Sequence, residues 1–317
     1  MKKFKVGLQL YSVRDAMEKD MDATLKAVKE MGYDYVEFAG YFDKSAEEVR
    51  ALLDKYGLEC ISVHQAIGLF EEEGKAAVDY LNTIGAKYSA IPWYEVDEYY
   101  KDWDGTMKKF AEVSKLLKEG NIQLMYHNHD FEFQKIDGEF ILDKMYATLS
   151  NDVLMPQLDT CWVHYAGQNP VEYIKKYNGK MEVLHLKDFV CEKLGGGPVY
   201  ALIDEDGNEM KPEDKSDAGF KFKPVGSGIQ DWKSILEAAF SVLNTSGKYR
   251  EDGTYEGTSL GSFGIGSKIT TFLSHWLTVT TIRDKVRETC HFKEGVFEQR
   301  ETIKESTLPT GTEVMWR

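Results

Sequence analysis

The sequence predicts an α/β fold of the (β/α)8 TIM-barrel type, with an atypical C-terminal segment that replaces the last βα unit. Three observations lead to this prediction. Short apolar runs of strand character alternate with amphipathic helical stretches over the first two-thirds of the chain. The runs lack strict alternation, as expected when both faces of a parallel sheet are covered. Polar residues stand at the end of one run after another, and the C-terminal ends of the strands are where a barrel of this type carries its catalytic residues.

Seven strands and the helices between them are expected in order along the chain. The strands are expected at residues 5–11, 35–39, 60–64, 87–92, 122–128, 154–160 and 181–187. Helices are expected at residues 22–31, 45–56, 106–118, from 169 onward and at 231–239. The helix at 45–56 begins with Ser45 and Glu48 at capping-box spacing and ends at Gly57. No GxGxxG follows the first strand, which disfavours a dinucleotide-binding sheet and favours the closed barrel.

Two segments interrupt this rhythm and set the expected domain organisation. Residues 191–223 are rich in Gly, Asp and Lys and are expected to form a long turn or hairpin inserted in the barrel. The composition then changes, so a barrel domain is expected at 1–240 and a divergent segment at 241–317. No eighth strand can be placed there from the pattern. One interpretation of residues 271–286 is a helix, which a β-branched run weakens.

Composition and charge narrow the class of protein. A chain of 317 residues, 42% of them hydrophobic, can bury a large core. The net charge of −14 comes without a Lys/Arg run, so neither a nucleic-acid partner nor an anionic membrane surface is expected. The first apolar run is too short for a signal peptide or a membrane span. Four cysteines without CxxC spacing argue against structural zinc and disulfides, so a reducing cytoplasm is expected.

The strongest local signal is a pair of histidines that ends the fifth expected strand. His127 and His129 stand two residues apart, so in a strand both would point to the same face. Two neighbouring imidazoles suit a transition metal or a proton-transfer pair. The alternative is a pair of hydrogen-bonded barrel histidines without catalytic function.

Ionisable residues also end the next two strands. Asp159 is either a metal ligand or a cap for the following helix, and beside the histidines we favour the ligand. Lys187 follows His185 on the same strand face and could polarise an oxygen, or form a salt bridge at the barrel rim. His127, Asp159 and His185 come from three successive strands, whose ends converge. The three can therefore reach one ion at about 2.0–2.2 Å.

Other residues near strand ends are candidates for the pocket wall. Glu37 ends the second strand and His64 the third, where both could bind substrate hydroxyls. The alternatives are a solvated rim charge for Glu37 and a core histidine for His64. Trp93 and Trp162 lie just past strand ends and could stack on a sugar face, although barrel packing explains them nearly as well.

This constellation predicts proton-transfer chemistry on a small sugar or polyol. A metal with an open ligand position would accept substrate oxygens and acidify the carbon next to a carbonyl by stabilising the enediolate. A neighbouring base would then move the proton, for which His129, Lys187 and Glu37 are the candidates. The chemistry covers aldose–ketose isomerisation, epimerisation and dehydration of a keto-polyol.

Six motifs, in order over three-quarters of the chain, carry a family resemblance. They are GLQLYSVRD at 7–15, GYDYVE at 32–37, YHNHDFEF at 126–133, LDT at 158–160, HLKD at 185–188 and PVGSGIQDW at 224–232. With them the sequence resembles the xylose-isomerase-like barrel superfamily, specifically proteins called sugar phosphate isomerase/epimerase, with inosose dehydratase beside them. Each motif is weak alone, but the ordered set is specific to the superfamily.

The resemblance implies a divalent cation, often manganese, cobalt, magnesium or zinc, and its ligands. In the family a carboxylate or equivalent on strand five, Asp on strand six, His on strand seven and Glu on strand eight hold the metal. Asp159 and His185 match the two middle positions, and His127 takes the strand-five place. The nearest match to the eighth strand is residues 296–301, which makes Glu298 the expected fourth ligand and Glu256 a weaker candidate. Such barrels often pair, so a homo-oligomer is also an expectation.

Two other functions compete with the metal-dependent sugar enzyme. An endonuclease-type barrel of the same superfamily would need further His and Glu ligands and a basic groove, neither of which is visible. A non-catalytic or impaired barrel that binds a sugar or a partner protein would explain the missing eighth strand. That alternative predicts ligand binding without turnover and no stoichiometric metal.

Overall fold

The chain forms two compact units, one of Phe4–Leu243 and the other made mainly of Asn244–Arg317. The computed structural model describes residues 6–195, 219–242, 276–283, 286–293, 296–304 and 311–316.

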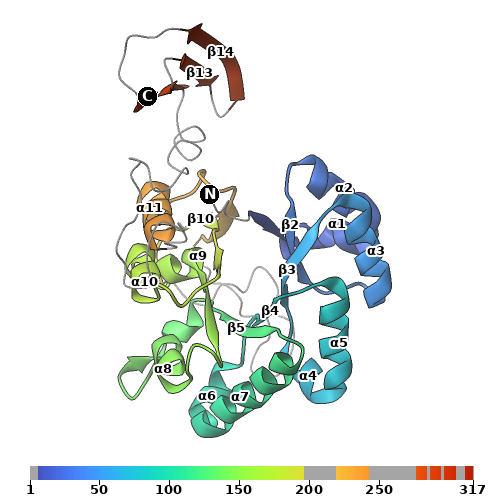
Figure 1. Cartoon of the computed structure of the whole chain (residues 1–317). Helices are drawn as coiled ribbons and strands as arrows, with labels where there is room; N and C mark the ends of the chain where they lie inside the picture. The colour runs from blue at the N-terminus through green and yellow to red at the C-terminus, as the bar shows by residue number, and fades with distance from the viewer. Residues whose placement is uncertain are drawn as a thin grey trace. The chain divides into compact units, whose positions relative to one another are not determined.

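The larger unit is built on a parallel sheet of seven strands. Each strand pairs in parallel with the next one along the chain, so the order in the sheet follows the sequence. The sheet curls into a partial ring with helices on its outer side (Figure 1). This is the (β/α)8 arrangement that the sequence predicted, with seven of its strands in the described residues. The strands are β1 (Gly7–Gln9), β2 (Tyr35–Ala39), β3 (Glu59–His64), β4 (Tyr88–Ile91), β5 (Gln123–His127), β8 (Met155–Asp159) and β9 (Val183–His185).

Helices connect successive strands and bury their apolar faces against the sheet. Val36 and Phe38 of β2 are fully buried, as are Leu25, Val49 and Leu53 on the two flanking helices. Burying a side chain of this size contributes about 1.5–3 kcal/mol. None of the described helices combines the length and apolar character needed to cross a bilayer. The helices are α1 (Arg14–Lys19), α2 (Met21–Glu30), α3 (Ala46–Tyr56), α4 (Ile67–Glu73), α5 (Lys75–Ile84), α6 (Val96–Lys101), α7 (Trp103–Glu119), α8 (Ile141–Thr148), α9 (Thr160–Tyr165), α10 (Pro170–Lys176) and α11 (Trp232–Val242).

Helix α3 begins with the capping box that its sequence predicted. The Ser45 hydroxyl accepts a hydrogen bond from the Glu48 N–H at 3.2 Å, and the Glu48 carboxylate accepts one from the Ser45 N–H at 2.8 Å. Gly57 ends the helix with φ of 61°, a left-handed conformation in which glycine avoids a steric penalty. Local sequence therefore fixes both ends of this helix.

Replacing Ser45 with Ala should lower the free energy of unfolding by about 1 kcal/mol, because the Glu48 N–H loses its acceptor. Chemical denaturation of both proteins measures the loss. Ser45→Asn restores a capping oxygen and should recover most of the stability. An equal loss in both variants would contradict the capping argument.

Two pairs of short antiparallel strands lie outside the parallel sheet. One joins β6 (Lys135–Ile136) to β7 (Glu139–Phe140), and the other joins β10 (Asp188–Val190) to β11 (Lys221–Lys223). The second hairpin frames the insertion expected at 191–223, of which residues 196–218 lie outside the described part.

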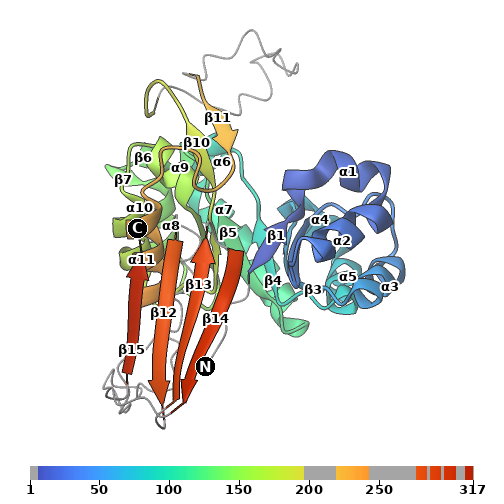
Figure 2. The same cartoon turned by 90° about the horizontal axis from the view of Figure 1, so that it is seen from above.

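The C-terminal unit contains a four-stranded antiparallel sheet in the order β14-β13-β12-β15 (Figure 2). Its members are β12 (Trp276–Arg283), β13 (Val286–Lys293), β14 (Val296–Lys304) and β15 (Gly311–Trp316). The interpretation of residues 271–286 as a helix is wrong over β12, where the β-branched run favours a strand.

The segment expected to be the eighth barrel strand belongs to this separate sheet. Glu298 lies in β14, which pairs antiparallel with β13. Gln299 pairs with His291 and Phe297 with Phe292, so Glu298 is the extra residue of a β-bulge. The expectation of a parallel eighth strand here is wrong. Glu298 was expected to be a metal ligand only because of that strand, so this assignment no longer has support. Glu256 lies outside the described residues.

Candidate metal centre

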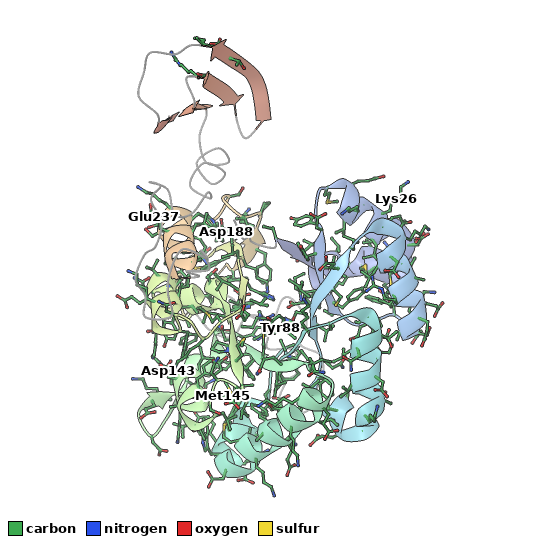
Figure 3. All side chains as sticks on the ribbon, viewed as in Figure 1. Lys26, Tyr88, Asp143, Met145, Asp188 and Glu237 are labelled. Carbon is green, nitrogen blue, oxygen red and sulfur yellow. The ribbon has the colours of Figure 1, made fainter. Side chains whose placement is uncertain are left out.

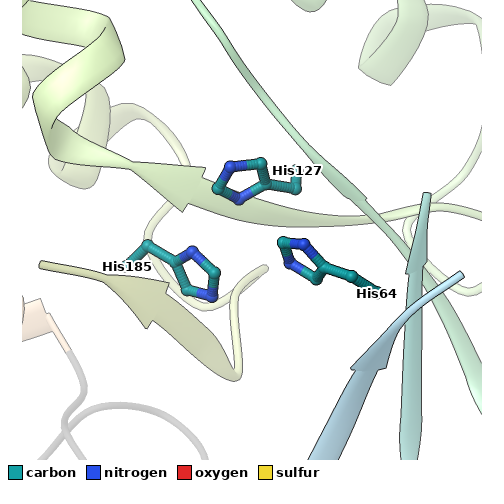
Figure 4. Close-up of side chains that lie close together, drawn as sticks. All are labelled: His64, His127 and His185. Atoms are coloured by element: carbon teal, nitrogen blue, oxygen red, sulfur yellow. The ribbon is translucent and has the colours of Figure 1, made fainter. Parts of the chain in front are cut away.

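Three imidazoles meet at the carboxyl ends of the barrel strands. His64 ends β3, His127 ends β5 and His185 ends β9. Figure 4 shows the three rings facing one another from these strands. One ring nitrogen of each lies within 4.8 Å of the other two, and the His127 and His185 centroids are 4.6 Å apart. The sequence led us to expect His127 and His185 together, but it had assigned His64 to substrate binding.

Asp159 lies beside these imidazoles at the end of β8 and is completely buried. Its Oδ2 is 3.7 Å from His127 Nε2 and 3.9 Å from His185 Nδ1. Its Oδ1 accepts a hydrogen bond from the Cys161 N–H at 2.9 Å and thereby caps α9. The helix cap thus uses Oδ1, whereas Oδ2 faces the imidazoles.

Glu37 of β2 contacts the ring nitrogen of His185 that faces away from Asp159. Its Oε1 lies 2.8 Å from His185 Nε2 and 3.0 Å from His64 Nε2. Burial pushes the pKa of Glu37 up, but the two imidazoles outweigh it and hold the pKa well below its ordinary value. Glu37 is only 4% exposed, so an ionised carboxylate is almost completely buried.

Gln157 connects Glu37 to His64 and was missed by the sequence analysis. Its Nε2 donates to Glu37 Oε2 at 2.6 Å, and its Oε1 lies 2.8 Å from His64 Nε2. A signal was available, because Gln157 stands two residues before Asp159 on the same strand face.

Buried polar atoms in this cluster fit a divalent cation. Nδ1 of His127 and Nδ1 of His185 make no hydrogen bond, and Asp159 Oδ2 makes ion-pair contacts without a hydrogen bond. Burial and the neighbouring imidazoles hold the pKa of His127 well below its ordinary value, so this ring is neutral and has a lone pair to donate. An unpaired buried polar atom costs about 1–3 kcal/mol. Imidazole and carboxylate donors together suit zinc, cobalt or manganese.

Lys187 places a positive charge at the edge of the cluster. Its Nζ is 3.2 Å from Asp159 Oδ2 and lies 5.8 Å from the centroid of the Trp162 ring. The side chain is 28% exposed, so the ammonium borders both the buried carboxylate and the solvent side.

His129 lies past the end of β5, so the expectation that it shares a strand face with His127 is wrong. The chain turns after His127, and the buried Glu132 carboxylate accepts the His129 N–H at 2.7 Å. The imidazole still lies next to the cluster, 5.1 Å from the His127 centroid, and stacks on Phe131. Burial and the Lys187 charge hold the pKa of His129 well below its ordinary value.

The aromatic wall differs from the sequence expectation. Trp162 is completely buried and stacks on Phe220 at 5.3 Å, so its indole has no open face for a sugar. Phe222 of β11, which the sequence analysis did not single out, is 47% exposed and lies edge-on to Trp162. Trp93 is 43% exposed, and no ring contact links it to the histidines in the described part of the chain. Phe222, from the hairpin of β10 and β11, is therefore an exposed aromatic ring next to Trp162 and Lys187.

Comparison with known proteins places this arrangement among related barrels. The family model for the xylose isomerase-like TIM barrel matches residues 25–241. An inosose dehydratase from Geobacillus kaustophilus is 24% identical over 193 residues, which cover 53% of this chain and 61% of that protein. The chain therefore spans about three-fifths of the length of this curated relative.

Two solved structures illustrate the shared fold. A sugar phosphate isomerase/epimerase from Parabacteroides distasonis has 25% identity and a TM-score of 0.53, covering 61% of this chain and 82% of its own. The IOLI protein, solved with a bound zinc atom, has 17% identity and a TM-score of 0.53, covering 75% of this chain and 85% of its own. At that identity the second likeness concerns the fold alone.

Proposed function

Because the chain belongs to the xylose isomerase-like TIM barrel family, we propose that it is a divalent-metal-dependent enzyme acting on a small sugar or polyol. The reaction is proton transfer at a carbon next to a carbonyl, as in an isomerase, an epimerase or a keto-polyol dehydratase. Relatives named inosose dehydratase and sugar phosphate isomerase/epimerase fall within this chemistry. The observation that carries the proposal is the buried convergence of His127, Asp159 and His185.

These three side chains would hold the cation. When bound, such a cation acts as a Lewis acid that polarises a substrate carbonyl oxygen and acidifies the adjacent carbon. Two imidazoles among the donors favour zinc, cobalt or manganese over magnesium, which prefers oxygen ligands. Neutral His127 has a lone pair for this role without first losing a proton.

Lys187 and His129 supply the proton-transfer chemistry. The Lys187 ammonium beside Asp159 can donate a hydrogen bond to a substrate oxygen as negative charge develops there. His129 is held neutral by burial and by the Lys187 charge, so its imidazole can accept a proton at neutral pH. The buried Trp162 lies next to both side chains.

Metal analysis of the purified protein tests the proposal. We expect about one tightly bound zinc, cobalt or manganese ion per chain, and at least tenfold weaker binding in His185→Ala, which lacks one of three ligands. Turnover of a ketose or inosose from a substrate panel should stop on chelation and return with added manganese or cobalt.

His164→Gln is a matched control, because His164 lies outside the cluster and bonds Gln230. It should bind metal as the wild type does. Turnover that survives complete metal removal would contradict the proposal, whereas sugar binding with neither turnover nor metal would indicate a non-catalytic barrel.

A further inference from the structure

We propose that His64, held in one tautomer by Gln157 and Glu37, is a further ligand of the metal centre and binds through Nδ1. This inference rests on the proposed metal-dependent function. It assigns to β3 the additional donor that the family resemblance puts on an eighth strand. The assignment replaces the expected roles of His64 in substrate binding and of Glu37 in catalysis.

The orientation of the Gln157 amide is fixed by its neighbour. Gln157 Nε2 donates a hydrogen bond to Glu37 Oε2 at 2.6 Å. The amide nitrogen must therefore face Glu37. Turning the amide over would bring two oxygens together, so Gln157 Oε1 has to face His64.

The proton on His64 follows from that orientation. His64 Nε2 lies 2.8 Å from Gln157 Oε1 and 3.0 Å from Glu37 Oε1, and both oxygens are acceptors. Nε2 must therefore carry the proton and donate it. In a neutral ring the lone pair is then on Nδ1. Within the described part of the chain, no hydrogen bond or ion pair engages that nitrogen.

The position of His64 suits a ligand. The ring centroids of His64 and His127 are 4.7 Å apart, those of His64 and His185 are 5.3 Å apart, and one nitrogen of each ring lies within 4.8 Å of the others. Two nitrogens that share a tetrahedral zinc ion are about 3.4 Å apart, judging by Zn–N distances. Because 4.8 Å is an upper limit, the ring nitrogens lie within about 1.4 Å of this separation.

The charge of Glu37 supports a cation on this side of the cluster. Glu37 Oε1 is buried and makes no hydrogen bond, and its close neighbours are the Nε2 atoms of His64 and His185. A buried carboxylate needs a compensating charge. Lys187 contacts Asp159 instead, so a cation held by His64 and His185 would neutralise Glu37. With both oxygens facing protein groups, Glu37 acts as a positioning residue.

Nitrogen-15 NMR of the histidine rings tests the tautomer and the ligation in the wild-type chain. At mildly alkaline pH the metal-free protein should show His64 with its proton on Nε2 and an unprotonated Nδ1. Adding zinc should shift the Nδ1 signal of His64 to the position of a metal-bound nitrogen. A His64→Gln variant identifies the signal.

Variants separate positioning from simple packing. Gln157→Leu keeps the size of the side chain but removes one of the two acceptors and leaves only Glu37 Oε1 beside His64 Nε2. The preference of His64 for this tautomer should therefore weaken, and zinc affinity should fall about 10–100-fold. Glu112→Leu, on the exposed face of α7, is the control and should change neither measurement.

Each outcome decides a different claim. Zinc bound with the His64 Nδ1 signal unmoved, or a proton found on Nδ1 in the metal-free protein, overturns the ligand assignment and leaves the proposed function standing. No zinc bound by the wild type overturns both.

Discussion

Replacing Asp188 with Ala is expected to lower the free energy of unfolding of the barrel unit by about 3–5 kcal/mol, because a single buried carboxylate organises the chain before α11. Asp188 is only 2% exposed and lies at β10, beside α11 (Figure 3). Five donors bond it at 2.8–3.3 Å, namely the N–H groups of Phe189, Gly226, Gly228 and Gln230 and the indole N–H of Trp232.

Residues 224–231 form no helix or strand. Hydrogen bonds to this carboxylate therefore fix their conformation. The backbone of Gly228 lies so close to Asp188 that an added Cβ would be 2.1 Å from Asp188 Oδ1. This position therefore requires glycine. Removing the carboxylate leaves several N–H groups without an acceptor, and water can replace it only where the loop is exposed.

The expected loss also depends on pH. Burial pushes the pKa of Asp188 up, but hydrogen bonds from Trp232 and the backbone outweigh it and leave the pKa lowered. A lowered folded-state pKa contributes stability above the unfolded-state value, and that stability is lost as the pH falls through the folded-state value. The difference in the free energy of unfolding between the wild type and Asp188→Ala should therefore become smaller at acidic pH.

Denaturant unfolding at neutral and acidic pH measures both effects. Asp152→Asn is the control, because Asp152 is an exposed carboxylate paired with Lys118 and its replacement should barely change the free energy of unfolding. A loss as small as that in Asp188→Ala would show that the loop holds its shape without the carboxylate.

The barrel strands were predictable because their signal is local. An apolar run bounded by glycines and followed by an amphipathic stretch identifies a buried parallel strand without knowledge of its neighbours. The expected strand at 35–39 is observed as Tyr35–Ala39, and the one at 60–64 as Glu59–His64. Helix α3 was predictable for the same reason, since its two caps lie within its own sequence.

Parts of the site were not predictable because they depend on tertiary structure. His64 is a lone histidine at a strand end, and only the curvature of the sheet brings it to His127 and His185. Phe222 reaches Trp162 because the chain returns after a long insertion. In the C-terminal unit, β-branched residues outweighed a weak helical period, which the pattern alone could not decide.

Glu132→Gln should raise the free energy of unfolding by a few kcal/mol at pH 8, because it removes an ionisation that the fold disfavours. Glu132 is fully buried, and burial raises its pKa from 4.5 to about 8 despite hydrogen bonds from the Tyr126 hydroxyl and the His129 N–H. Glutamine imitates the protonated acid, since its oxygen can accept from His129 while its amide donates to Tyr126.

The sign of the effect follows from the raised pKa. The stability associated with protonated Glu132 is fully present below 4.5 and is lost as the pH rises toward about 8, because the unfolded chain releases its proton first. Glutamine has no proton to release, so the variant should keep its stability across this window. The two curves should diverge above about pH 4.5 and run parallel above about pH 8.

Denaturant unfolding of both proteins at a series of pH values from about 5 to about 9 makes the comparison. Glu139→Gln, at an exposed position of β7, should give a curve parallel to the wild type. Parallel curves for wild type and Glu132→Gln as well would mean that Glu132 ionises normally in the folded state. Its pocket would then have to hold a charge, and the turn that carries His129 past β5 would be anchored by a carboxylate anion instead of a neutral acid.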